Sequence, residues 1–140
     1  MNPVNLAYVA GVLDCDGSIK VDMTANRKSV QCSLIIYNSE RMLLEKCKAV
    51  IGGSVCGPYF HNVKQKKPYF HLNLYAQKTL LEVLKALLPY LVIKKKIALK
   101  MVEYLEYRVN KFHKRQTKED TKFFNEIRSL QLSNYEKEQK

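Results

Sequence analysis

VAGVLDCDG, residues 9–17, places two acidic side chains where an apolar helix is expected to end. Asp14 and Asp16 lie at the C-terminal end of that helix, where partial negative charge disfavours each carboxylate by about 0.3–1 kcal/mol. A hard divalent cation, which binds carboxylate and carbonyl oxygens, would compensate both. A plain turn is the alternative, because D-x-D-G is common where aspartates bond to nearby backbone groups.

The helix that leads into this stretch spans about residues 3–13 and has two different faces. Asn2 can cap it, and Pro3 suits its first turn. One face is apolar and suited to the core: Leu6, Val9 and Leu13. The other face carries small residues: Ala7, Ala10 and Gly11. Small residues let a second helix come close, so two such helix ends could meet. Paired metal ions about 4 Å apart are a known arrangement for phosphodiester hydrolysis.

The segments downstream alternate between strand and helix periodicity. Residues 17–24 and 29–37 place apolar side chains at every second position, which predicts two strands with one solvated face. A second pair of strands is expected at about 54–62 and 68–76, and further helices at about 39–50, 78–88, 94–111 and 118–131. The order α-β-β-α-β-β-α, followed by more helices, predicts a mixed α/β (α+β) fold. It would contain a curved antiparallel sheet and extra C-terminal helices.

The chain is strongly basic, with a formal net charge of +11 over 140 residues. That charge indicates a polyanionic partner such as DNA, RNA or an acidic membrane surface. The four cysteines and three histidines lack zinc-site spacing, which predicts free thiols in a reducing compartment. Neither a signal peptide nor a membrane-length apolar run is visible. We therefore expect an intracellular protein, cytoplasmic or organellar and not secreted, with no membrane partner.

Two stretches resemble the LAGLIDADG homing endonucleases. VAGVLDCDG is similar to the family's signature, with Val9 in place of the leading leucine, and the flanking LAY (6–8) and SIK (18–20) also fit. PYLVIKKKIA (89–98) resembles the family's second landmark, a proline and apolar residues before the lysine-rich start of a helix. The expected αββαββα order matches the family's core domain as well.

The resemblance implies a single endonuclease domain over residues 1–140, with its core at about 4–108 and a C-terminal helical extension at about 109–140. It implies a homing endonuclease, active in intron or intein mobility, that hydrolyses both strands of a long, near-palindromic double-stranded DNA target. The cofactor would be Mg²⁺ or another divalent cation such as Mn²⁺, with Ca²⁺ supporting binding without cleavage. Only one motif occurs in the chain, so the active site requires a homodimer. No other protein partner is evident.

The resemblance also assigns roles to single residues. Asp16 would be the acidic metal ligand, joined by the backbone carbonyl of Cys15. Lys94 would be the basic residue near the scissile phosphate, which agrees with its place near a helix N-terminus, where a cation is disfavoured without an anion beside it. Asn38 stands near the family's water-positioning residue. The interface between two motif helices would be formed by Ala7, Ala10, Gly11 and Asp14.

Polar side chains on the strands and basic side chains in the loops are candidates for DNA contacts, because a β-sheet can lie in the major groove. The strand candidates are Lys20, Asp22, Thr24, Ser29, Gln31, Ser33, His71 and Asn73. The candidates in loops and at a helix start are Asn26, Arg27, Lys28, Lys64, Lys66, Lys67, Lys95 and Lys96. Any exposed sheet face is polar, so simple solvation of each side chain is the alternative.

Two other functions stay open. A catalytically silent protein of the same fold, acting as an RNA maturase or a DNA-binding regulator, would share the fold and the charge. Retention of Asp16 favours the nuclease, because a pure binder has no use for an acid directed at phosphate. An unrelated basic structural protein, such as a ribosomal one, would be a monomer without a role for Asp16.

Overall fold

The structure, a computed structural model, describes residues 1–24, 29–64, 67–110 and 115–138, with side chains up to residue 131. The helices are α1 (Pro3–Asp16), α2 (Arg41–Ile51), α3 (Gln77–Leu87), the short 3-10 helix η1 (Leu88–Tyr90), α4 (Lys95–Val109) and α5 (Lys118–Glu138). The strands are β1 (Gly17–Met23), β2 (Val30–Asn38), β3 (Ser54–Tyr59) and β4 (Tyr69–Leu74). The predicted element order is therefore confirmed. The first helix is longer than predicted, so Asp14 and Asp16 belong to its last turn.

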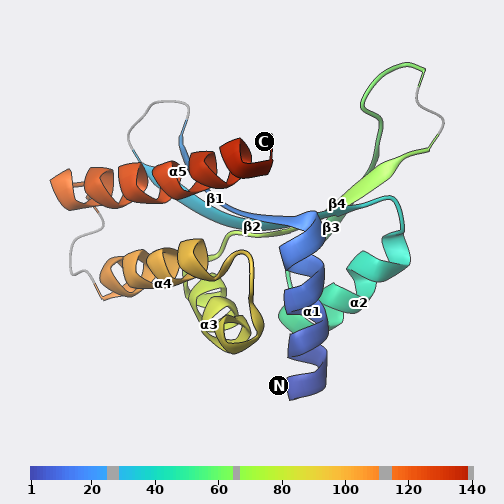
Figure 1. The fold of residues 1–140 in the computed structure, drawn as a ribbon, viewed down its shortest axis with the longest axis horizontal. Coiled ribbons are helices and arrows are strands. Elements are labelled where there is room, and N and C mark those ends of the chain that lie inside the picture. Colours follow the sequence, from blue (N-terminus) through green and yellow to red (C-terminus); the bar gives the residue numbers. More distant parts are fainter. Residues whose placement is uncertain (25–28, 65–66, 111–114, 139–140) are drawn as a thin grey trace.

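The four strands form one antiparallel sheet in the order β1-β2-β4-β3. The two hairpins join through β2 and β4, where Leu34 faces Leu74 and Tyr37 faces His71. Figure 1 shows the sheet as a curved band, with α1, α2, α3 and α4 on one side. The predicted curved antiparallel sheet is thus confirmed.

The core lies between the sheet and these helices. The inward side chains predicted for the first two strands are confirmed, because Val21, Leu34 and Ile36 are completely buried. The solvated face predicted for the second strand is corrected at Ser33 and Ile35, which are only 5 % and 9 % exposed. α1 contributes Leu13, which is also completely buried. At Gly17 a Cβ would lie 2.5 Å from Leu13 Cδ1 and 2.9 Å from the Leu13 carbonyl oxygen, so a residue with a side chain would collide with α1. Glycine therefore lets β1 begin directly at the last turn of α1.

α5 covers the outer edge of β1. The Val21 backbone N–H donates to Gln131 Oε1 at 3.4 Å, and the Val21 carbonyl accepts from Arg128 Nη1 at 3.4 Å. An edge strand leaves such backbone groups open to pairing with other chains, and these side chains satisfy them. Figure 1 shows α5 running beside β1 and above α4.

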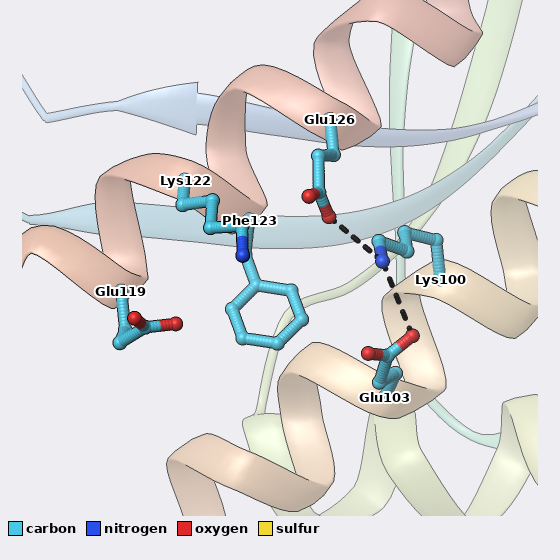
Figure 2. A pocket seen from close by; sticks show the side chains of 6 residues that line it. All are labelled: Lys100, Glu103, Glu119, Lys122, Phe123 and Glu126. Atoms are coloured by element: carbon cyan, nitrogen blue, oxygen red, sulfur yellow. Dashed lines mark hydrogen bonds and ion pairs between the residues drawn. The ribbon is translucent and has the colours of Figure 1, made fainter.

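Ion pairs also join α5 to α4 in the pocket shown in Figure 2. Lys100 Nζ lies 2.7 Å from Glu126 Oε2 and 3.3 Å from Glu103 Oε2. The hydrogen bond to Glu126 raises the pKa of Lys100, so the ammonium stays charged. Glu103 belongs to α4 and Glu126 belongs to α5, so these ion pairs hold the two helices together. Within the described ranges, no helix has the length and apolar character needed to cross a bilayer.

Candidate active site

The last turn of α1 brings Asp16 and Asn38 together. Asn38, the last residue of β2, donates from Nδ2 to Asp16 Oδ2 at 3.0 Å. The Asn38 amide is oriented from its other end, because its Oδ1 accepts the Glu40 backbone N–H at 2.7 Å. Asp16 is exposed at the end of the helix. Two of the predicted catalytic residues therefore meet, and Asn38 holds the carboxylate of Asp16.

Asp14 lies in the same turn but faces the protein interior. Its side chain is 9 % exposed. Its Oδ2 accepts the Val92 backbone N–H at 2.9 Å, and its Oδ1 accepts the Lys94 backbone N–H at 3.0 Å. Asp14 thus fixes the segment that leads into α4. The expectation that both carboxylates need a cation is corrected, because the backbone donors already compensate Asp14.

Lys94 reaches the same turn with its side chain. Its Nζ donates to the Asp14 backbone carbonyl at 2.9 Å, at the negative end of the α1 dipole. The argument that Lys94 is disfavoured by its own helix is corrected, because its charge lies against the C-terminus of another helix. Asp16, Asn38 and Lys94 therefore gather around the last turn of α1, although they are far apart in the sequence.

The donors at this turn suit a hard cation. Asp16 offers an exposed carboxylate, and Cys15, an exposed free thiol, precedes it in the chain. Carboxylate and carbonyl oxygens are the ligands that Mg²⁺ prefers. Among the residues that the structure describes, no three His, Cys, Asp or Glu side chains form a metal-binding group. Asp16 is therefore the exposed carboxylate that a metal ion could bind at this turn.

The exposed face of α1 differs from the predicted small-residue stripe. Ala10 is completely buried in the core, so its predicted contact with a second helix is corrected, and Asp14 is buried as described above. Ala7 and Gly11 are exposed as predicted, and a Cβ at Gly11 would meet no atom within 4 Å. The exposed apolar side chains Val4 and Tyr8 lie one turn from these residues. The open face is therefore Val4, Ala7, Tyr8 and Gly11.

The residues that were predicted to contact DNA differ in their exposure to solvent. The exposed ones are Asp22, Gln31, Lys64, Lys67, Lys95 and Lys96, and the half-buried ones are Lys20, Thr24, Ser29 and His71. Ser33 and Asn73 are only 5 % and 7 % exposed, because they lie in the central strands β2 and β4. Their predicted contact with bases is corrected, since they have little surface to offer. The predictions for Asn26, Arg27, Lys28 and Lys66 fall outside the described residues.

A cluster of five aromatic rings on the sheet was missed by the sequence reasoning, apart from His71. We call it the aromatic patch: Tyr37, Tyr59, His61, Tyr69 and His71. The His61 ring stacks on Tyr69 with centroids 4.3 Å apart, and Tyr59 lies 4.8 Å from His71. Burial, and then the charge of Lys20, lower the pKa of His71, so that its ring is neutral at pH 7.

The alternation along the strands places the aromatic patch on the face of the sheet opposite the core. Ile36 and Leu72 are completely buried, so their neighbours Tyr37 and His71 point the other way. Tyr37 pairs with His71 across β2 and β4, and Tyr59 pairs with Tyr69 across β3 and β4. The patch begins at Tyr37, one residue before Asn38, and continues toward the loop after β3.

The chain resembles solved structures of LAGLIDADG homing endonucleases. I-CvuI in complex with its target is 22 % identical with a TM-score of 0.65, over 77 % of this chain and 69 % of that one. The archaeal intron-encoded I-Vdi141I, complexed with DNA, is 18 % identical with a TM-score of 0.69, over 90 % and 83 %. I-SmaMI bound to cleaved DNA is 21 % identical with a TM-score of 0.67, and this chain spans 42 % of its length.

No protein-family model and no curated protein sequence matches the chain. The evidence from the comparisons is therefore structural, and at these identities it concerns the fold. The four-stranded antiparallel sheet and the helices on one of its sides agree with that evidence. The chain has the fold of the LAGLIDADG homing endonucleases.

Proposed function

We propose that the protein is a site-specific DNA endonuclease that acts as a homodimer and cuts both strands of a near-palindromic target with divalent cations. The meeting of Asp16, Asn38 and Lys94 at the last turn of α1 supports this proposal most strongly. An acid held by an amide beside a lysine suits phosphodiester hydrolysis, in which the negative charge of the phosphate must be neutralised. Mobility of an intron or intein would be the biological use.

The metal-binding residues of the proposal are Asp16 and the backbone carbonyl of Cys15. A bound Mg²⁺ or Mn²⁺ would neutralise the scissile phosphate and lower the pKa of a water molecule. Asn38 keeps Oδ2 of Asp16 in place through its 3.0 Å hydrogen bond. The ammonium of Lys94 brings a positive charge to the same turn, where it can stabilise the charge that develops on phosphate.

The homodimer is supported by the exposed Asp16 carboxylate and by the open face of α1. Each chain supplies one exposed carboxylate at the turn, so a second copy would bring the second. Val4 and Tyr8 are 75 % and 43 % exposed, although both are large and apolar. Packing this face against its own copy would bury them and bring the two Asp16 residues toward each other.

Double-stranded DNA as the substrate is supported by charge and by the neighbouring structures. The net charge of +11 suits the phosphate backbone, and Lys64, Lys67, Lys95 and Lys96 are exposed. I-CvuI is described in complex with its target in the presence of Ca, and in another structure with DNA not cleaved in the presence of Mg. We extend this binding to the present chain. That Mg²⁺ supports cleavage and Ca²⁺ supports binding alone is a separate part of our proposal and is not drawn from these two structures.

A catalytically silent DNA-binding regulator or RNA maturase is the second candidate, because the same fold and charge would serve it. The experiment that separates the candidates begins with a random duplex library in EDTA, from which bound duplexes are recovered and sequenced. A recovered duplex, labelled on both strands, is then incubated with Mg²⁺, Mn²⁺ or EDTA. The nuclease predicts two cut strands with either metal and none in EDTA.

Three outcomes would contradict the nuclease. Enrichment of a duplex that neither metal causes to be cut would support the silent regulator. Tight binding to a structured RNA without enrichment of any duplex would support the maturase. A monomer in light scattering that enriches no nucleic acid would support a structural protein.

A further inference from the structure

The aromatic patch forms a continuous carbon-rich surface on the face of the sheet that points away from the core. Neighbouring rings contact one another: Tyr37 lies 5.9 Å from His71 and 6.5 Å from Tyr69, and Tyr59 lies 5.6 Å from Tyr69. Tyr37 and Tyr59 are still 37 % and 39 % exposed. An exposed aromatic cluster on a basic protein indicates a contact surface rather than core packing.

A β-bulge creates this cluster. The pairing of β3 with β4 shifts by one residue between Cys56, which faces His71, and Tyr59, which faces Tyr69. If alternation continued without a bulge from Cys56, Tyr59 would point to the core side, since side chains alternate along a strand. Gly57 permits the bulge with a φ of 130°, and a Cβ there would lie 2.8 Å from Phe70 Cδ1 and 3.0 Å from the Tyr69 carbonyl oxygen. The bulge thus places the Tyr59 side chain on the outer face of the sheet.

The chemistry of the aromatic patch differs from that of the rest of this face. Lys20, Asp22 and Gln31 on β1 and β2 can bond to polar base edges or phosphates. The patch offers ring carbons beside its tyrosine hydroxyls, and burial lowers the pKa of His71, which favours the neutral form of that ring. An apolar group would find a matching surface on the ring carbons of the patch.

We propose that the aromatic patch selects thymine in the target through the 5-methyl group. This inference rests on the proposed function, and it adds to it that the outer face of the sheet lies in the major groove of the bound duplex. The thymine methyl is the apolar group that base pairs present in that groove. The exposed Lys64 and Lys67, on the loop between β3 and β4, would hold the phosphates beside it.

Unpaired bases are the other occupant with matching chemistry, because bases stack on aromatic rings. The ring contacts favour the methyl group. The His61 and Tyr69 planes lie at 11° to each other, so each ring already uses one face. Tyr69 also has tilted contacts with Tyr37 and Tyr59, which reduce the ring surface open to a stacked base. A methyl group requires only a small area of apolar surface.

The test replaces thymine by uracil, one position at a time, in a duplex recovered from the random library, and measures binding in EDTA. Uracil pairs like thymine and lacks only the methyl group, so the experiment needs no protein variant. At positions under the patch we expect about fourfold weaker binding for each methyl removed, which corresponds to the burial of one carbon. Equal binding of the thymine and uracil duplexes at every position would overturn the inference.

Matched variants assign the effect to the patch. Tyr59→Ser should bind thymine and uracil duplexes alike at the affected positions, while Tyr59→Phe, which keeps the ring, should retain the fourfold difference. Tyr75→Ser is the control, because Tyr75 is 48 % exposed just after β4 and lies outside the patch. If Tyr59→Phe bound thymine and uracil duplexes equally, the Tyr59 hydroxyl group and not the ring would distinguish them. If Tyr75→Ser bound them equally, the difference would depend on the whole face of the sheet and not on the patch. Either result would overturn the inference.

The outcomes also separate this inference from the proposed function. If the wild-type protein enriches no duplex, both fail. If it enriches and cuts a duplex that tolerates uracil everywhere, the inference alone fails. If it prefers single-stranded oligonucleotides to every duplex, the rings bind unpaired bases and the methyl-group inference is wrong.

Discussion

Asp14 and Asp16 are two residues apart on one helix, yet their surroundings give them different tasks. Asp14 bonds to the backbone of Val92 and Lys94 and fixes the start of α4. Asp16 is exposed and is held by the side chain of Asn38. An acidic pair that looks equivalent in the sequence is therefore divided into one structural and one candidate metal-binding carboxylate.

Asn38 is a positioning residue in this account, because it acts through Asp16. Removing its side chain in Asn38→Ala leaves the Asp16 carboxylate free to rotate. A hydrogen-bond partner of a metal ligand typically contributes about 10–100-fold to metal affinity or activity. We expect the Mg²⁺ concentration for half-maximal cleavage to rise by about tenfold, with most of the rate recovered at saturating Mg²⁺.

Asn62→Ala provides the matched control for this measurement. Asn62 Oδ1 accepts the Lys64 backbone N–H at 2.9 Å, just as Asn38 Oδ1 accepts that of Glu40 at 2.7 Å. Both variants lose a local turn contact, but only Asn38→Ala loses a bond to Asp16. Equal Mg²⁺ requirements in the two variants would show that Asn38 does not hold the metal ligand.

The sequence predicted the candidate site residues better than it predicted their environments. Asp16, Asn38 and Lys94 were selected from local patterns and from the resemblance, and the fold brings them to one turn. The partners of Asp14 could not be predicted, because Val92 and Lys94 lie about eighty positions away in the chain. The surroundings of Lys94 could not be predicted for the same reason. Its ammonium group bonds to the C-terminal end of α1 and does not lie against the N-terminal end of α4.

At the scale of elements, α5 is fastened to α4 by a buried carboxylate. Asp120 is completely buried, accepts the Tyr104 hydroxyl at 2.8 Å and the Thr117 backbone N–H at 2.8 Å, and lies 3.5 Å from Arg108 Nη1. Burial and the bond to Asp120 raise the pKa of Tyr104, which keeps its hydroxyl protonated as a donor. The C-terminal helix is thus a supporting element of the fold.

We expect Asp120→Ala to lower the free energy of unfolding by about 3 kcal/mol, because it removes the acceptor of the buried Tyr104 hydroxyl and the carboxylate beside the nearly buried Arg108 guanidinium. Urea unfolding followed by circular dichroism measures this loss. Asp22→Ala is the control, since the Asp22–Arg128 pair is about half exposed and should contribute less than about 1 kcal/mol. Similar losses in both variants would contradict the anchoring role of Asp120.

Element types were predictable from periodicity, whereas the aromatic patch was not. The alternation of β1 and β2 was strong enough to predict which of their apolar side chains face the core. In β3, one extra residue at the bulge reverses the direction of Tyr59, and alternation counted along the chain cannot detect it. Gly57 and Pro58 were the available signal, because glycine and proline inside a strand pattern indicate a bulge.

At the scale of the whole molecule, the proposal requires two chains joined through α1. Gly11→Glu tests this interface without disturbing the fold, because a side chain at Gly11 would meet open space. We expect light scattering to show a dimer for the wild-type protein and a monomer for Gly11→Glu, and we expect cleavage to be lost. Ala49→Glu, at an exposed alanine on α2, should remain a cleaving dimer.

A monomeric wild-type protein that still cuts both strands would contradict the homodimer. A monomeric Gly11→Glu variant that cuts at the wild-type rate would do so as well. Both results would mean that one chain forms the complete metal site. The proposal, in contrast, requires one Asp16 carboxylate from each of two chains.

The charge of the whole chain predicts a steep dependence of DNA binding on salt. Each phosphate that a lysine or arginine neutralises releases counterions, so affinity falls as the salt concentration rises. We expect the affinity for the recovered duplex to fall by at least about tenfold between about 50 and 200 mM salt. A flat salt dependence would show that the exposed lysines do not contact phosphate.

The cleavage rate of Asp16→Asn on the recovered duplex in Mg²⁺ tests the central claim most directly. Glu82→Gln serves as the control, because it makes the same chemical change at an exposed carboxylate on α3, away from the site. We predict that Asp16→Asn binds the duplex but cuts both strands more than about 100-fold more slowly, since a metal ligand should contribute more than its hydrogen-bonding partners do. Cleavage by Asp16→Asn at the rate of Glu82→Gln would contradict the proposed active site.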